Sequence, residues 1–133
     1  YTLLDQSALP ELLPLCQEKN ISVMIGGPYN SGILASDLAS AASYFYSDAP
    51  PEVLERARRI KGACDRHQVP LKAVALQFGL AHPAVASTIP GARSPAEIEE
   101  NVRMAEHPIP DALWAELRQE GFLPDDAPTP SGG

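Results

Sequence analysis

Residues 85–95 read VASTIPGARSP, and this stretch decides the fold class. Its first five residues, VASTI, form a short run rich in β-branched side chains, which is typical of a buried β-strand. The glycine-containing turn at residues 90–93 follows, and Ser94 and Pro95 then occupy the N-cap and first positions of a helix, where these residue types are preferred. The stretch therefore predicts a strand, a tight turn and a helix in direct succession.

A second strand lies upstream, at residues 21–25 (ISVMI). It is also short, apolar and rich in β-formers, and Gly26-Gly27-Pro28 end it sharply. We expect it to be buried like the strand at residues 85–89. The following residues, 29–50, are small and irregular, which predicts a long loop with a short helical turn, and loops of this length are often functional.

The remaining segments predict helices. The first begins at Ser7 as N-cap, and Pro14 kinks it or shortens its first turn. Apolar residues that recur every three or four positions define most of the others. The predicted helices cover residues 7–19, 51–67, 70–81, 95–105 and 110–120.

The order of elements is helix, strand, long loop, two helices, strand, helix, helix, and no hairpin signal interrupts it. Two strand-helix units of this kind predict an α/β fold with parallel strands joined by helical crossovers. Two parallel strands make no independent sheet, so we expect partner strands upstream. The chain opens at Tyr1 inside an apolar run without an initiator methionine, which also favours part of a longer protein.

Composition narrows the class further. With 133 residues and 44% hydrophobic residues the chain corresponds to one domain, for which we predict residues 1–123, while the proline-rich, acidic segment 124–133 predicts a disordered tail. A net charge of −7 argues against nucleic acid and anionic membranes as partners. The sequence has no signal-peptide layout, and its Cys16 and Cys64 lie outside metal-ligand spacings, which favours free thiols, no metal and a cytoplasmic location.

The turn at residues 90–93 has the chemistry of an anion site. Unpaired N–H groups at a helix N-terminus bind phosphate, Gly91 allows close approach of the chain, and Arg93 adds a bidentate donor. An alternative needs no ligand, because Ser94 and Glu97 also form the pattern of a capping box, in which Glu97 accepts from the Ser94 N–H.

The loop after the first strand, residues 26–32 (GGPYNSG), presents glycines, a hydroxyl and free amides. In a parallel barrel both loops would follow the carboxyl ends of strands, where ligands bind and phosphate sites form. The alternative is that both are ordinary turns.

Two motifs, residues 27–34 (GPYNSGIL) and residues 87–95 (STIPGARSP) with Glu100 and Asn101, resemble the aldo/keto reductases. The first motif is most similar to the branch of bacterial and plant dehydrogenases that act on fucose, galactose and related aldoses. The resemblance implies the C-terminal part of a (β/α)8 TIM barrel, with strands seven and eight at residues 21–25 and 85–89. It also implies that the family's catalytic Asp, Tyr, Lys and His come from earlier strands, so we place no catalytic residue here.

The resemblance further implies a nicotinamide dinucleotide as cofactor, NAD or NADP. It assigns the pyrophosphate to the first loop and the adenosine end to the second, with cofactor-binding residues Gly27, Tyr29, Ser31, Gly91, Ala92, Arg93, Glu97, Glu100 and Asn101. Glu97 stands where NADP-preferring members commonly place an arginine, which favours NAD, although Arg93 argues the other way. Gly26 stands where many members place an aromatic ring that stacks on the nicotinamide.

We therefore expect an oxidoreductase that interconverts an aldose or similar alcohol and its carbonyl or lactone product by hydride transfer. Its partner would be a small sugar or aldehyde, and the sequence carries no signal for the oligomeric state. The alternative is a non-catalytic regulatory subunit of the same fold that binds the nucleotide. Residues 1–133 alone are expected to bind the dinucleotide weakly and to show no turnover.

Overall fold

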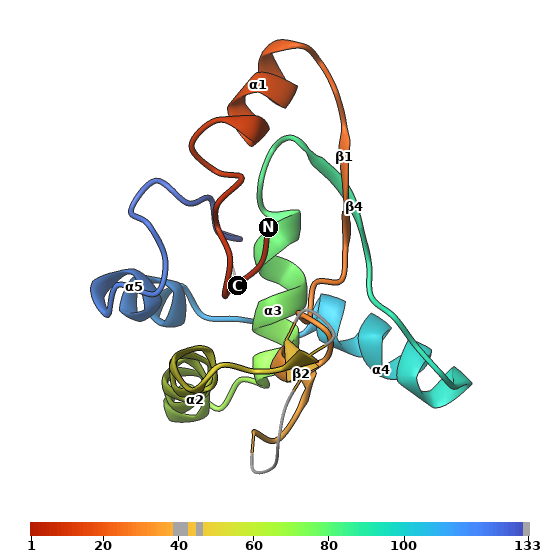
Figure 1. The fold of residues 1–133 in the computed structure, drawn as a ribbon, viewed down its shortest axis with the longest axis vertical. Coiled ribbons are helices and arrows are strands. Elements are labelled where there is room, and N and C mark those ends of the chain that lie inside the picture. The colour runs from red at the N-terminus through yellow and green to blue at the C-terminus, as the bar shows by residue number, and fades with distance from the viewer. Residues whose placement is uncertain (39–42, 45–46, 132–133) are drawn as a thin grey trace.

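The computed structural model describes residues 1–38, 43–44 and 47–131 (Figure 1). The elements in this part of the chain follow one another as α1 (Leu12–Glu18), β1 (Val23–Gly26), the 3-10 helix η1 (Ile33–Ala35), β2 (Ser43–Tyr44), β3 (Ser47–Asp48), α2 (Pro51–Arg66), α3 (Leu71–Leu80), β4 (Val85–Ile89), α4 (Pro95–Glu106) and α5 (Asp111–Gln119). The predicted elements are all present, and the predicted helical turn in the long loop is η1. Parts of that loop, residues 39–42 and 45–46, lie outside the described residues.

The strands β1 and β4 pair in parallel, as the strand-helix order predicts. Val23 lies opposite Val85 and Gly26 opposite Ile89, so both strands leave the sheet at the same edge. A second pairing was not predicted: β2 and β3 form a small antiparallel ladder with Ser43 opposite Asp48. Two residues per strand are too few for an alternating apolar pattern, which explains why the sequence shows no hairpin signal.

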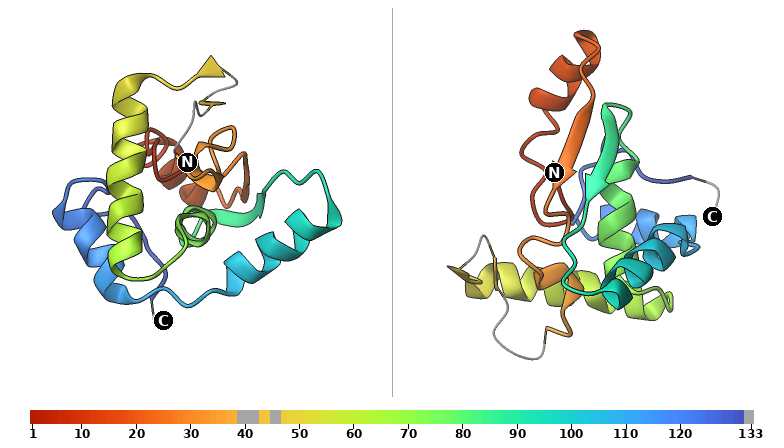
Figure 2. Two further views of the ribbon diagram at one scale, coloured as in Figure 1. Left: turned by 90° about the horizontal axis from the view of Figure 1, so that it is seen from below. Right: turned by 90° about the vertical axis from the view of Figure 1, so that its right-hand side faces the viewer.

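Helix α3 is the centre of the packing. Figure 2 shows it between α2 and α5 on one side and α4 on the other. Its phenylalanine Phe78 is fully buried and lies 6.4 Å from the ring of Trp114 on α5, centroid to centroid. We call α2, α3 and α5 the helical layer, since their apolar side chains supply much of the buried core, among them Ala57, Ile60, Val74, Leu113 and Leu117.

Helix α1 begins later than predicted, at Leu12 and not near Ser7. Pro14 has no N–H to donate, so a helix accommodates it without losing a hydrogen bond if it lies in the first turn. The start at Leu12 puts it there. Ser7 lies in the preceding turn, where its backbone N–H donates to the Asp5 carboxylate at 2.9 Å.

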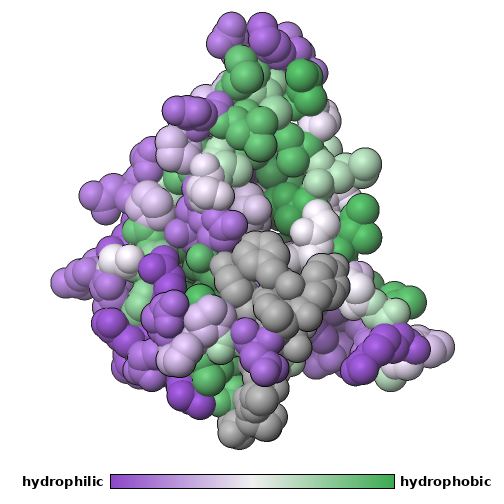
Figure 3. Space-filling view, in the orientation of Figure 1, coloured by the Kyte–Doolittle hydropathy of each residue, from purple (hydrophilic) through white to green (hydrophobic). Residues whose placement is uncertain are grey.

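The prediction that both strands are buried is wrong. Ile25 is buried, whereas Met24 is 69% exposed and Ile89 is 57% exposed. Apolar surface accordingly gathers over α1, β1 and β4 in Figure 3. A parallel strand loses its solvent contact when helices cover both faces and strands flank it, and within the described residues the two strands pair with each other alone.

The C-terminal segment makes specific contacts where its composition predicts a disordered tail. Ala127 is buried, and the Arg118 guanidinium donates to the Ala127 carbonyl at 3.0 Å and to the Thr129 hydroxyl at 2.7 Å. Residues 132–133 lie outside the described residues. The domain boundary at residue 123 stays a prediction.

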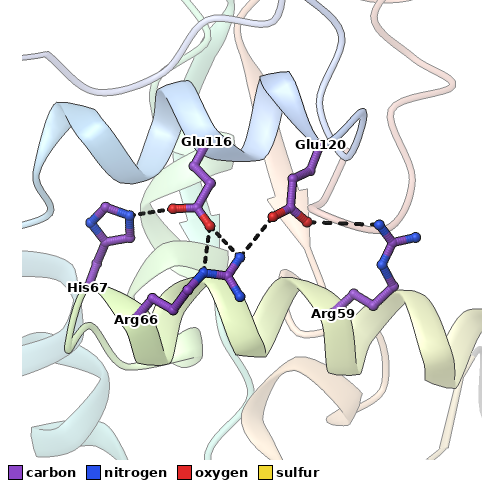
Figure 4. A network of polar contacts seen from close by, with 5 residues as sticks. All are labelled: Arg59, Arg66, His67, Glu116 and Glu120. Atoms are coloured by element: carbon purple, nitrogen blue, oxygen red, sulfur yellow. Dashed lines mark hydrogen bonds and ion pairs between the residues drawn. The ribbon is translucent and has the colours of Figure 1, made fainter.

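Charged side chains join α2 to α5 (Figure 4). The Arg66 guanidinium donates to the carboxylates of Glu116 and Glu120, and Nε2 of His67 lies 2.6 Å from Oε2 of Glu116. The hydrogen bond from His67, and then those from Arg66, lower the pKa of the Glu116 carboxyl below its usual value. We call this network the α2–α5 seam.

The two cysteines and one histidine are buried in the fold. Cys16 and Cys64 are free and buried, as predicted. His82 lies just after α3 and is buried, and its Nδ1 accepts from the Ala84 N–H at 3.1 Å. No helix in the described ranges has the length and apolar character needed to cross a bilayer.

Candidate functional site

The parallel pairing brings the two predicted ligand loops to one edge of the sheet. The loop after β1 carries Gly27, Tyr29 and Ser31, and the loop after β4 carries Gly91, Ala92 and Arg93. Three further predicted residues, Glu97, Glu100 and Asn101, lie on α4, which begins directly after the second loop. We call these two loops and the first two turns of α4 the ligand edge.

The loop after β1 follows an unusual backbone path. Gly27, Asn30, Ser31 and Gly32 all have positive φ, with 97° at Gly32, a region that favours glycine and tolerates asparagine. Hydrogen bonds hold this path, because the N–H groups of Gly32 and Leu34 both donate to the Tyr29 carbonyl at 3.1 Å. Within it, the Asn30 side chain is buried and no described group donates to its Oδ1.

The start of α4 is capped, but not as the capping-box pattern predicts. The Ser94 hydroxyl accepts from the Glu97 N–H at 3.3 Å, which is one of the two hydrogen bonds of a capping box. The Glu97 carboxylate, however, accepts from the Arg93 N–H at 2.6 Å and not from the Ser94 N–H, and its other oxygen lies 3.3 Å from the Arg93 guanidinium. The bond from the Arg93 backbone is the main cause of the lowered pKa of Glu97, so this side chain is a carboxylate at neutral pH.

This arrangement leaves donors available at the ligand edge. Gly91 and Ala92 are exposed, and no described residue accepts from their backbone N–H groups. The Arg93 side chain beside them is 92% exposed. Free amides, one guanidinium and the N-terminus of a twelve-residue helix together favour a bound anion such as a phosphate.

A buried hydrogen bond connects the two halves of the ligand edge. The Tyr29 hydroxyl donates to Oδ1 of Asn101 at 2.9 Å, and both residues are buried. Lys72, at the start of α3, lies 5.4 Å above the Tyr29 ring, and its ammonium donates to Oε2 of Glu100 at 2.7 Å. Lys72 was not predicted as part of the site, because nothing in its local pattern separates it from any charged residue in a first helical turn.

Comparison with solved structures defines the class of fold. The chain is similar to an aldo-keto reductase from Bacillus halodurans in its holo form, with a TM-score of 0.66 and 28% sequence identity. The match covers 90% of this chain and 40% of that structure. The apo form of the same protein matches equally well, with a TM-score of 0.67. The fold is therefore part of a (β/α)8 barrel, of which β1 and β4 are two neighbouring strands.

The model of the aldo/keto reductase family matches residues 1–120, and the chain belongs to this family. It is 45% identical over 123 residues to a pyridoxal 4-dehydrogenase from Microbacterium luteolum and 39% identical over 125 residues to a D-threo-aldose 1-dehydrogenase from a Pseudomonas species. These matches cover 92% and 93% of this chain but 36% and 38% of the relatives. The chain thus spans little more than a third of their length.

Proposed function

We propose that the complete protein is an NAD(P)-dependent oxidoreductase that interconverts an aldose or a similar alcohol and its carbonyl or lactone product. The single observation that carries this proposal is the ligand edge, where the loop after β4 presents the unpartnered N–H groups of Gly91 and Ala92 beside Arg93, and the loop after β1 lies at the same edge of the sheet. Membership of the aldo/keto reductase family supports it. In this proposal residues 1–133 hold the pyrophosphate and adenosine of the cofactor, while the catalytic group stands on other strands.

The donor set fits a dinucleotide. Backbone N–H groups of the loop after β1, including those of Gly27 and Tyr29, would hold the pyrophosphate together with Ser31. Gly91, Ala92 and Arg93 would hold the adenosine phosphate and ribose, and Glu100 and Asn101 the base. The bound cofactor supplies the hydride acceptor or donor, and the residues of this chain bind it and fix its orientation. Gly26 offers no ring for the nicotinamide, so another side chain would have to position that end.

The Glu97–Arg93 pair supports NAD as the preferred cofactor. Arg93 is engaged by Glu97 through both its backbone N–H and its guanidinium. A 2′-phosphate would have to displace the carboxylate from Arg93 and would also be repelled by it, whereas a ribose 2′-hydroxyl can donate to the same carboxylate. NAD can thus bind while the contact between Glu97 and Arg93 stays intact.

The test measures the dissociation constants of NAD and NADP by calorimetry on the complete protein before and after Glu97→Arg. We expect NADP affinity to rise roughly tenfold relative to NAD affinity, because a repulsive charge becomes an attractive one. Glu99→Arg is the matched control, since it makes the same charge change on the exposed side of α4. An equal shift in both variants would show a general charge effect and would remove Glu97 as the selector.

Turnover is tested separately with a panel that contains an aldose and pyridoxal, since the two relatives are named for these substrates. NAD-dependent oxidation or reduction of any member supports the enzyme. Tight dinucleotide binding without turnover of any member contradicts it and supports the regulatory subunit of the same fold.

A further inference from the structure

The cluster of Tyr29, Lys72, Glu100 and Asn101 joins three elements that are far apart in the sequence. Tyr29 comes from the loop after β1, Lys72 from α3, and the other two residues from α4. Tyr29 and Asn101 are buried and joined by one hydrogen bond of 2.9 Å. The Lys72 ammonium lies over the Tyr29 ring, so the cation–π contact and the ion pair with Glu100 hold this lysine from two sides.

The hydrogen bond from Tyr29 determines which side of the Asn101 amide is available. An asparagine amide has one oxygen that accepts and one nitrogen that donates. Oδ1 is taken by the Tyr29 hydroxyl, and none of the described residues accepts from Nδ2. Asn101 also lines a groove of about 380 Å³ between α3, β4 and α4. What Asn101 can offer a ligand is therefore a donor.

The ion pair with Lys72 fixes the place of the Glu100 carboxylate, a group that can only accept hydrogen bonds. Oε2 of Glu100 accepts from the Lys72 ammonium at 2.7 Å, while no described group donates to Oε1. The Glu100 side chain is 45% exposed, so its free oxygen reaches solvent. What Glu100 can offer a ligand is an acceptor, and it stands next to the Asn101 donor in the sequence.

We infer that Tyr29 and Lys72 are positioning residues, Tyr29 by orienting the Asn101 amide and Lys72 by holding the Glu100 carboxylate in place, so that this neighbouring acceptor and donor recognise adenine. This inference rests on the proposed function. Adenine presents an exocyclic N6–H2 donor beside a ring nitrogen that accepts, which matches the Glu100 carboxylate and the Asn101 amide nitrogen. Hypoxanthine, the deaminated base, has an oxygen in place of the amine and would face the carboxylate with a second acceptor.

Tyr29 is suited to this role at any ordinary pH. Burial, with a smaller contribution from the charge of Glu100, raises its pKa to about 12. The hydroxyl therefore keeps its proton, and the phenol remains a donor to Oδ1 of Asn101 throughout the range in which the protein would be assayed. The direction of the bond, and with it the exposed face of the amide, does not change with pH in that range.

The experiment compares the dissociation constants of NAD and of its hypoxanthine analogue, nicotinamide hypoxanthine dinucleotide, in the complete protein. We expect the original protein to bind the analogue at least about tenfold more weakly, because a paired acceptor and donor reject a base with the wrong polarity. Tyr29→Phe keeps the ring and removes the hydroxyl, so the amide can turn over. The ratio of the two constants should then fall to about threefold or less.

Tyr1→Phe is the matched control for this variant. Tyr1 also carries a buried hydroxyl, but no described group is its hydrogen-bond partner, so the same change should leave the ratio as it is. Lys72→Met should lower the ratio in the same direction as Tyr29→Phe. Its control is Lys61→Met, which breaks an exposed ion pair with Asp65 on α2, remote from the ligand edge in sequence.

The ratio of two affinities separates positioning from a merely structural role, because a loosened fold weakens both ligands alike. An unchanged ratio in Tyr29→Phe, with normal binding of NAD, would overturn the inference and leave the proposed function standing. Failure of the original protein to bind either dinucleotide would overturn both. A lower ratio in Tyr29→Phe together with an unchanged one in Tyr1→Phe is the result we expect.

Discussion

The helical layer and the ligand edge are built in opposite ways. In the layer, the side chains of Phe78, Leu113, Trp114 and Leu117 are each at most 1% exposed and belong to one apolar cluster. At the ligand edge the glycines are exposed, Ile98 on α4 is 57% exposed, and order comes from hydrogen bonds and left-handed backbone. The difference shows that burial stabilises one region, whereas the other keeps polar groups accessible for a ligand.

The largest expected effect is in the helical layer. Trp114→Ala should lower the free energy of unfolding by about 3–5 kcal/mol, because it leaves a cavity among buried side chains. Ile98→Ala, at the ligand edge, should change it by less than about 0.5 kcal/mol in this chain, since that side chain is largely exposed. Denaturant titration of both variants measures the contrast, and equal losses would contradict it.

A pair of glycines sharpens the comparison. Gly32→Ala should cost about 1 kcal/mol or more, because its φ of 97° is unfavourable for a residue with a side chain. Gly62→Ala, inside α2, should instead stabilise by about 0.5–1 kcal/mol, since alanine is the better helix former and its Cβ would meet nothing closer than the Arg66 side chain at 3.7 Å. Thermal unfolding should shift in opposite directions for the two variants, and shifts of the same sign would refute this account.

A smaller effect concerns the first turn of α4. Ser94→Ala removes the acceptor of the Glu97 N–H and should cost about 0.5–1 kcal/mol, the usual contribution of an N-cap. Ser22→Ala, an exposed serine outside any helix, is the matched control and should be neutral. If denaturant unfolding gave the two variants the same stability, the cap would contribute nothing.

The smallest expected effect is at the surface of the helical layer, in the α2–α5 seam. The pKa of Glu116 is lowered in the folded chain by His67 and Arg66, so its contribution to stability is present above the unfolded value of 4.5 and is lost as pH falls below it. Glu116→Gln should therefore flatten the loss of stability between neutral pH and about pH 3. Melting temperatures of both proteins across that range provide the measurement. Parallel curves would exclude Glu116 as a source of acid sensitivity.

Local sequence patterns predicted the elements well and their surroundings less well. The predicted strand at residues 85–89 and the predicted helix at residues 95–105 agree with β4 and α4 almost residue for residue, because apolar spacing, Ser94 and Pro95 act within a few residues. The strand burial was predicted wrongly, since burial depends on what packs from elsewhere. The second hydrogen bond of the expected capping box was predicted wrongly for a similar reason, because the Arg93 N–H and not the Ser94 N–H donates to the Glu97 carboxylate.

The candidate site divides along the same line. The sequence by itself determined the two polar loops, the helix N-terminus and the parallel order that brings them to one edge. Tertiary structure decided the partners: Tyr29 with Asn101 across 72 positions of sequence, and Lys72 with Glu100 across 28. Periodicity and capping are properties of neighbouring residues, whereas a hydrogen bond between distant elements exists when the packing of α3, α4 and the loop after β1 brings its atoms together.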